Sequence, residues 1–111
     1  MIIHICSINL WEAAKRLGYY EAESLKSQGF IHCSKPEQVV KVANFNFKGT
    51  EDLLLLLIDE QKIKSEIKYE DGGSGELYPH IYGPIDIVAV ENTVAFPPDT
   101  DGTFKLPELP N

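Results

Sequence analysis

Arginine is almost missing from this chain, because Arg16 is the only one among 111 residues. Bidentate recognition of phosphate groups normally uses arginine, so the sequence argues against a site built on an arginine cluster. The formal net charge of -7 agrees, since proteins that bind nucleic-acid backbones usually carry a basic face. We therefore expect no nucleic acid as a general partner. The net charge does not argue against a local basic pocket.

Long apolar segments and cysteines are also scarce. The longest uninterrupted apolar run, Leu53–Ile58, is far too short to cross a bilayer, so we expect no membrane association. No basic stretch precedes a long apolar run at the start, which argues against a signal peptide. Cys6 and Cys33 do not have CxxC spacing, and we expect reduced thiols in a cytoplasmic protein.

The length and composition indicate one globular domain. The chain is 43% apolar and 24% charged, which is ordinary for a soluble protein with its own core. We assign residues 1–96 to a single α+β domain. Residues 97–111 are rich in proline and acidic side chains, and we expect a tail that follows the surface or is partly disordered.

Hydrophobic periodicity predicts helices only in the N-terminal half. We expect them over residues 10–17, 24–28 and 35–44. Gly18 is suited to end the first of these, and either Ser7 or the capping-box pair Asn9 and Glu12 can begin it.

Extended segments dominate the second half. We expect strands over residues 1–6, 30–33, 52–59, 67–70, 76–82 and 85–90, with a continuation of the last to Phe96 left open. Residues 52–59 contain the apolar run, so both faces of that strand should be covered, as in a central strand. The segment 67–70 fits an edge strand, and the three glycines after Asp71 predict a flexible loop. Because helices come early and strands late, we predict an α+β fold with a bent or split β-sheet.

The segment Gly29–Ser34 is expected to form a short buried strand that runs directly into a helix. Ser34 and Glu37 have capping-box spacing, and Pro36 suits the first helical turn. This arrangement would place His32 and Ser34 beside a helix N-terminus, where free N–H groups favour an anionic ligand. The segment His4–Ser7 likewise leads from a strand into a helix, so we predict that the two strand ends form two walls of a site.

All three histidines lie in extended apolar segments. Any one of them can be a core histidine satisfied by the backbone. Because all three histidines lie in such segments, we favour a shared site. Each has a polar or aromatic neighbour in sequence: His4 with Ser7, His32 with Ser34, and His80 with Tyr82.

The segment from Glu76 to Pro84 combines tyrosines, His80 and a carboxylate between two turns. Such rings can stack on a flat heterocycle, and a glutamate can hold a ribose hydroxyl; equally, the tyrosines can simply cover the sheet. We interpret the remaining acidic residues of this region as a solvated face: Asp59, Glu60, Glu66, Glu70 and Asp71.

Two other chemistries have candidate residues. Histidines 4, 32 and 80 with the two cysteines are zinc-ligand types, but no pair has compact ligand spacing, and we expect no metal. A Cys–His nucleophile is also compatible with these residue types. No clear base stands beside Cys6, so we favour a core role for both cysteines.

Several segments together closely resemble the small bacterial family called domain of unknown function 952. They are His4–Ser7, Ser24–Leu25, Gly29–Ser34 with Gln38, Asp52–Leu56 and Pro79–Pro84. The likeness runs from about Ile3 to Phe104. The His-Cys-Ser and Pro-His-Ile-Tyr-Gly-Pro segments are its specific parts.

That pattern is in turn similar to the ADP-ribosyltransferase fold, which includes RNA 2′-phosphotransferases. The resemblance implies a split, bent β-sandwich with NAD held in the cleft between its halves. It implies that His4 binds the ribose or phosphate on the adenosine side, that Ser34 braces the site, and that a tyrosine such as Tyr82 stacks on nicotinamide. Glu76 is the only nearby match for the family's glutamate on the last site strand, and the lack of arginine disfavours RNA phosphotransfer.

The residues thus predict a small cytoplasmic protein that binds a nucleotide ligand, NAD or an ADP-ribose-like molecule. For glycosidic cleavage at the nicotinamide ribose we assign Glu76 and His80 as catalytic residues. The binding residues are then His4, Ser7, His32, Ser34 and Tyr82. Two alternatives remain: a non-catalytic binding module and, more weakly, a metal-dependent hydrolase that uses the histidines.

Overall fold

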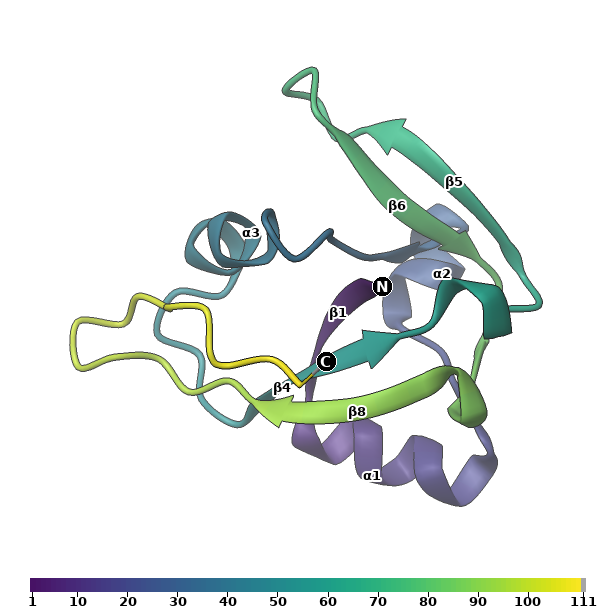
Figure 1. Cartoon of the computed structure of the whole chain (residues 1–111), viewed down its shortest axis with the longest axis horizontal. Helices are drawn as coiled ribbons and strands as arrows, with labels where there is room; N and C mark the ends of the chain where they lie inside the picture. Colours follow the sequence, from purple (N-terminus) through teal and green to yellow (C-terminus); the bar gives the residue numbers. More distant parts are fainter. Residues whose placement is uncertain (111) are drawn as a thin grey trace.

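The computed structural model describes residues 1–110, and its helices lie in the N-terminal half as predicted (Figure 1). The first six elements are β1 (Ile2–Ser7), α1 (Ile8–Leu17), β2 (Tyr19–Tyr20), α2 (Glu23–Gln28), β3 (Ile31–His32) and α3 (Val39–Asn46). The later strands are β4 (Leu53–Ile58), β5 (Glu66–Asp71), β6 (Leu77–Tyr82), β7 (Ile85–Asp86) and β8 (Val90–Ala95). Single 3₁₀ turns occur at Glu60–Lys62 and Ile87–Ala89. None of the helices in residues 1–110 has the length and apolar character needed to cross a bilayer.

All strand pairs are antiparallel and fall into separate sheets. One sheet has the order β1–β4–β8, a second has β3–β6–β5, and β2 pairs with β7. Figure 1 shows the β5–β6 hairpin projecting away from the β1–β4–β8 sheet. Residues 1–110 therefore form a mixed fold with several antiparallel sheets and three helices, and β5 is an edge strand as expected.

Strand β4 is the central strand that its leucine run predicts. It pairs with β1 on one side and β8 on the other, and its residues alternate between two apolar clusters. On one face, Leu56 and Ile58 pack with Trp11 of α1. On the other, Leu55 and Leu57 pack in the cluster that contains Val39 and Ala43 of α3. Because helices cover both faces, the strand carries no polar side chain.

A single backbone bridge connects the two three-stranded sheets. Ile3 and Ser34 exchange two N–H···O bonds of 2.8 Å. In an antiparallel ladder, the next such pair would be Ile5 with His32. The ladder stops instead, and Nδ1 of His4 donates to the carbonyl of His32 at 2.6 Å. The two sheets are thus joined at one point and separate beyond it.

The side chain of His4 is held at both nitrogens. A carbonyl only accepts, so Nδ1 carries the proton, and Nε2 accepts from the hydroxyl of Tyr20 at 2.9 Å. Burial lowers the pKa of His4 from 6.5 to about 4, which keeps the imidazole neutral at pH 7. This histidine therefore replaces a ladder bond where the two sheets divide.

One of the predicted helix caps is confirmed and another is wrong. Ser7 caps α1 by accepting from the N–H of Leu10 at 3.2 Å, and Gly18 ends the helix with a φ of 89°. The predicted capping box of Ser34 and Glu37 is wrong, because α3 begins only at Val39 and has no side-chain cap.

Residues 35–38 form a turn closed by the bond from the N–H of Gln38 to the carbonyl of Lys35. The capping box requires Ser34 at a helix N-cap, but its backbone is committed to the bridge with Ile3. The helix N-terminus expected beside His32 and Ser34 is therefore not there.

The C-terminal part differs from the prediction in two respects. Residues 85–90 are not one strand: the turn Ile87–Ala89 moves the chain from β7 to β8, which lies in another sheet. The segment after Ala95 returns to the core, where Phe104 is buried and stacks on Phe96 with ring centroids 4.7 Å apart. The side chain of Asn44 bonds both backbone groups of Phe104 and so fixes this segment against α3.

The buried His4 predicts a specific loss of stability in mild acid. The unfolded chain takes a proton at His4 below pH 6.5, whereas the folded chain does not until about pH 4. The stabilisation from the neutral His4 is therefore complete above pH 6.5. As the pH falls towards 4, the free energy of unfolding decreases by up to about 3 kcal/mol. Urea unfolding at pH 7, 6 and 5 should show this slope in the wild type and a much smaller slope in His4→Gln.

His32→Gln is the matched control, because that imidazole is exposed. It should keep most of the wild-type pH dependence. An unchanged slope in His4→Gln would contradict the assignment of a neutral, buried His4.

Candidate functional site

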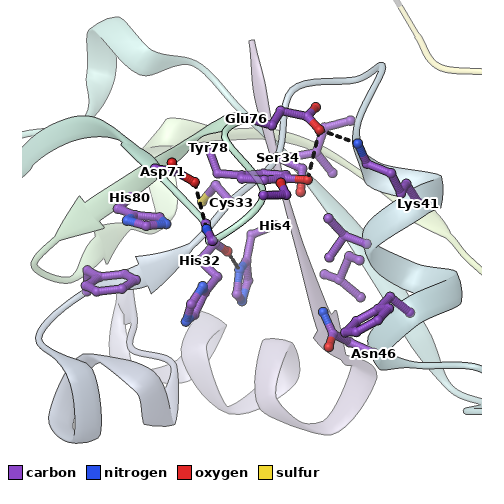
Figure 2. Close-up of a pocket in the computed structure, with 18 of the residues that line it drawn as sticks. His4, His32, Cys33, Ser34, Lys41, Asn46, Asp71, Glu76, Tyr78 and His80 are labelled. Atoms are coloured by element: carbon purple, nitrogen blue, oxygen red, sulfur yellow. Dashed lines mark hydrogen bonds and ion pairs between the residues drawn. The ribbon is translucent and has the colours of Figure 1, made fainter.

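A cleft of about 1000 Å³ opens where the two sheets separate (Figure 2). Its wall of strands is formed by β1, β3 and β6, and its opposite wall by α3. The loop between β5 and β6 closes one side. The cleft thus begins at the Ile3–Ser34 bridge and brings together residues that are far apart in sequence.

The strand wall carries all three histidines. His4, His32 and His80 line the cleft from β1, β3 and β6 (Figure 2). The N–H of Cys33 donates to the carbonyl of Pro79, so the neighbouring pair His32–His80 is of the non-hydrogen-bonded type, in which side chains lie closer. Their rings meet edge to face with centroids 5.4 Å apart. The three histidines, for which we favoured a shared site, therefore line one cleft.

The three imidazoles differ in environment. His4 is buried with both nitrogens engaged. His32 is exposed and donates Nε2–H to Oε1 of Gln28 at 2.9 Å, and its pKa is lowered by partial burial and then by the charge of His80. His80 is buried and stacks on Phe30, with centroids 4.0 Å apart and ring planes 14° apart.

Glu76 stands at the edge of the cleft in a fixed position. Its carboxylate accepts from the amide of Gln38 at 2.9 Å and from the ammonium of Lys41, and the hydroxyl of Tyr78 lies 3.4 Å from it. Hydrogen bonds from Lys41 and Gln38 lower the pKa of Glu76, so the group is ionised at neutral pH. The predicted catalytic glutamate lines the cleft, but a cation already accompanies it.

Gln38 is the residue that orients this carboxylate. Although polar, its side chain is buried, and every amide contact is used: the oxygen accepts from the N–H of Lys35, and the nitrogen donates to Glu76 and to the carbonyl of Leu77. It connects the turn before α3 to the start of β6. Glu76 is therefore held between two elements.

The glycine loop is organised by Asp71. Its carboxylate accepts from the N–H groups of Gly73 and Gly75 at 2.7 and 2.9 Å, and these bonds lower its pKa. Asp71, Glu76 and Lys41 are the charged side chains that line the cleft within residues 1–110. The formal charge of these three side chains together is therefore negative.

The α3 wall is more apolar. Val42 and Phe45 line it, and Phe45 is 88% exposed. Asn46 lies on the same wall (Figure 2). On the other side, Phe30 and Tyr78 contribute further rings. The cleft therefore combines flat apolar surfaces with hydrogen-bonding groups, which is typical of small-molecule sites.

Neither cysteine has the environment of a nucleophile. Burial raises the pKa of Cys6 to about 12 and raises that of Cys33 still further, so both remain thiols. Among residues 1–110, no group of three or more His, Cys, Asp and Glu side chains has a geometry that could hold a metal ion.

Two predicted site residues are not among those that line the cleft. Ser7 serves as the cap of α1. The hydroxyl of Tyr82 donates to Glu70, and the ammonium of Lys68 is 4.8 Å from its ring centroid. His4, His32, Ser34, Glu76 and His80 do line it.

Sequence reasoning missed Glu70 and Phe30. Glu70 was interpreted as part of a solvated face; its side chain is partly exposed, but its carboxylate also accepts from both His80 and Tyr82. Pairing residues 66–71 with 77–82 around the glycine loop would have placed Glu70 opposite Tyr78 and diagonal to His80. For Phe30 no sequence signal marks the stacking on His80.

Comparison with known proteins gives a family but no activity. The family model described as a protein of unknown function (DUF952) matches residues 5–93. The crystal structure of protein CC0527 from Caulobacter crescentus is 32% identical, with 95% of this chain and 93% of that chain covered and a TM-score of 0.87. Its solution NMR structure, also 32% identical, covers 92% and 89% of the two chains with a TM-score of 0.80. No curated protein matches this sequence. The matched residues include two of the three cleft histidines and both walls of the cleft, and this chain belongs to the DUF952 family.

Proposed function

We propose that the cleft binds NAD or an ADP-ribose-like nucleotide and that the fold is of the ADP-ribosyltransferase type. One observation carries the proposal: hydrogen-bonding groups from β1, β3 and β6 gather with aromatic rings in one cleft at the junction of two sheets. A split sheet with its ligand at the division is what the sequence resemblance implies. The volume, about 1000 Å³, lies at the upper end of the usual range for small-molecule sites.

The chemistry of the cleft suits the nucleoside part of such a ligand. Phe30 and Tyr78 offer faces for a heterocycle, and the hydroxyl of Ser34 with the imidazole of His32 offers partners for ribose hydroxyls. Lys41 is the cleft cation within residues 1–110, and it is paired with Glu76. We therefore propose that binding relies on stacking and ribose contacts more than on gripping the diphosphate.

Cleavage of the nicotinamide–ribose bond is the reaction that we propose for an active enzyme. Positive charge develops on the sugar as the bond breaks, and an ionised carboxylate stabilises such charge. Glu76 is ionised and oriented, which supports this role. The acceptor of the ribosyl group is water or a hydroxyl.

A specific observation favours a second function, a non-catalytic binding module. The carboxylate of Glu76 is already engaged by Lys41, Gln38 and Tyr78, so its charge is partly compensated before a ligand arrives. In that case the same cleft recognises the nucleotide without consuming it.

Binding is tested by thermal shift and ligand-observed NMR with NAD, ADP-ribose, nicotinamide and AMP. A ligand at 100 times its Kd should stabilise the folded state by about 2.7 kcal/mol. His32→Ala should lose most of this gain, because it removes an exposed imidazole of the cleft without opening the core. Lys64→Ala, at a position 87% exposed and outside the cleft, should behave like the wild type. Failure of all four compounds to bind would exclude the proposal.

Catalysis is tested by comparing Glu76→Gln with Lys41→Ala. Both variants break the same ion pair, but only the first removes the carboxylate. If Glu76 stabilises the transition state, Glu76→Gln should lower nicotinamide release by at least about 100-fold with retained NAD binding, while Lys41→Ala keeps activity. Equal losses in the two variants would assign the pair a structural role. Binding without any nicotinamide release in the wild type would select the binding module.

A further inference from the structure

A carboxylate–imidazole pair involves the cleft residue His80 and has no part in the binding and cleavage steps proposed above. Nδ1 of His80 on β6 is 2.9 Å from Oε1 of Glu70 on β5, and the hydroxyl of Tyr82 donates to the same oxygen. These bonds, that from Tyr82 first, lower the pKa of Glu70, so the carboxylate is ionised and only accepts. In the neutral form of the His80 ring, the proton therefore resides on Nδ1.

The ring of His80 is fixed from several sides. Phe30 stacks on its face, and His32 meets it edge to face. Its strand position is set by pairing with His32 in β3 and with Lys68 in β5. Both the tautomer and the orientation of the imidazole are thus determined before any ligand binds.

The second nitrogen of His80 is left available. Nε2 makes no hydrogen bond to residues 1–110, whereas every fully buried side-chain nitrogen or oxygen in that part of the chain has a partner. Nε2 is therefore not fully buried, and His80 lines the cleft. With Nδ1 protonated, Nε2 presents a lone pair that can take a proton.

We propose that His80 is the general base of the cleft and that Glu70 is its positioning residue. The substrate class is a ribosyl compound together with an O–H nucleophile, water or a hydroxyl acceptor. This inference rests on the proposed function and deepens it by assigning the proton acceptor. A carboxylate that fixes the tautomer of a catalytic histidine is a recurrent device in unrelated enzymes.

The other two histidines do not meet these conditions. His4 has no available nitrogen, and its pKa is lowered to about 4. His32 bonds to the amide of Gln28 rather than to a carboxylate, and it is exposed. Within residues 1–110, His80 alone combines an ionised partner with a second ring nitrogen that makes no hydrogen bond.

The proton and the electrons balance in the proposed step. The oxygen of the nucleophile forms a bond to the anomeric carbon of the ribose, and its O–H proton passes to Nε2 of His80. The glycosidic C–N bond breaks, and its electron pair leaves with the nicotinamide nitrogen, which becomes neutral. The proton on His80 is later released to water.

Kinetics of nicotinamide release separate a positioning role from a structural one. We expect Glu70→Gln to lower kcat by at least roughly 100-fold with little change in KM, because the ground-state contacts remain. Glu66→Gln is the matched control: it removes the same charge from the same face of β5, but Glu66 does not contact His80. It should keep wild-type kcat. Equal losses in the two variants, or a loss confined to KM, would overturn the proposal.

The tautomer of His80 gives a readout that needs no turnover. Long-range ¹H–¹⁵N spectra of the neutral ring should show Nδ1–H in the wild type and in Glu66→Gln. In Glu70→Gln, the amide can donate to Nδ1, so the Nε2–H form should appear. An Nε2–H ring in the wild type would refute the assignment. If the wild type releases no nicotinamide, the reaction proposed above fails, while the tautomer still decides whether Glu70 positions His80.

Discussion

The two hydrogen bonds between Ile3 and Ser34 determine how the rest of the molecule is arranged. They join the β1–β4–β8 sheet to the β3–β6–β5 sheet at one residue pair. Had the ladder continued, Ile5 would lie beside His32, where the cleft now begins. The carbonyl of His32 still needs a donor, because buried backbone groups are rarely left unpaired. The side chain of His4 supplies that donor, so the burial of His4 is a consequence of the division of the sheets.

The chemistry of the cleft follows from this division. The non-hydrogen-bonded pairing of His32 with His80 brings two imidazoles to one face, and the β5–β6 hairpin carries Glu70 to the second of them. The turn before α3 places Gln38 where it orients Glu76. Strands thus position the histidines, while the glycine loop and the exposed Phe45 complete the lining of the cleft. Such a division of labour is typical of sites that must fix reactive groups yet admit a ligand.

Local patterns in the sequence predicted those elements whose residue types alone indicate burial or a helix end. The leucine run of β4 indicated coverage on both faces, and the glycines at 18 and 29 marked helix ends. Such patterns could not predict contacts between residues far apart in the sequence. Ser34 looked like a helix cap because its spacing to Glu37 fits, but its backbone is committed to Ile3, which lies 31 positions earlier in the chain. Glu70 looked solvated because the strand pairing that puts it on His80 depends on the sheet order.

The central claim is that this cleft, and no other surface, receives an ADP-ribose-like ligand. The most direct measurement is a ¹H–¹⁵N chemical-shift map of the amides during titration with ADP-ribose. The account predicts saturable shifts that cluster in residues 32–34, 42–46 and 72–76, which belong to the walls of the cleft. Saturable shifts centred elsewhere, or no shifts at millimolar ADP-ribose, would contradict it.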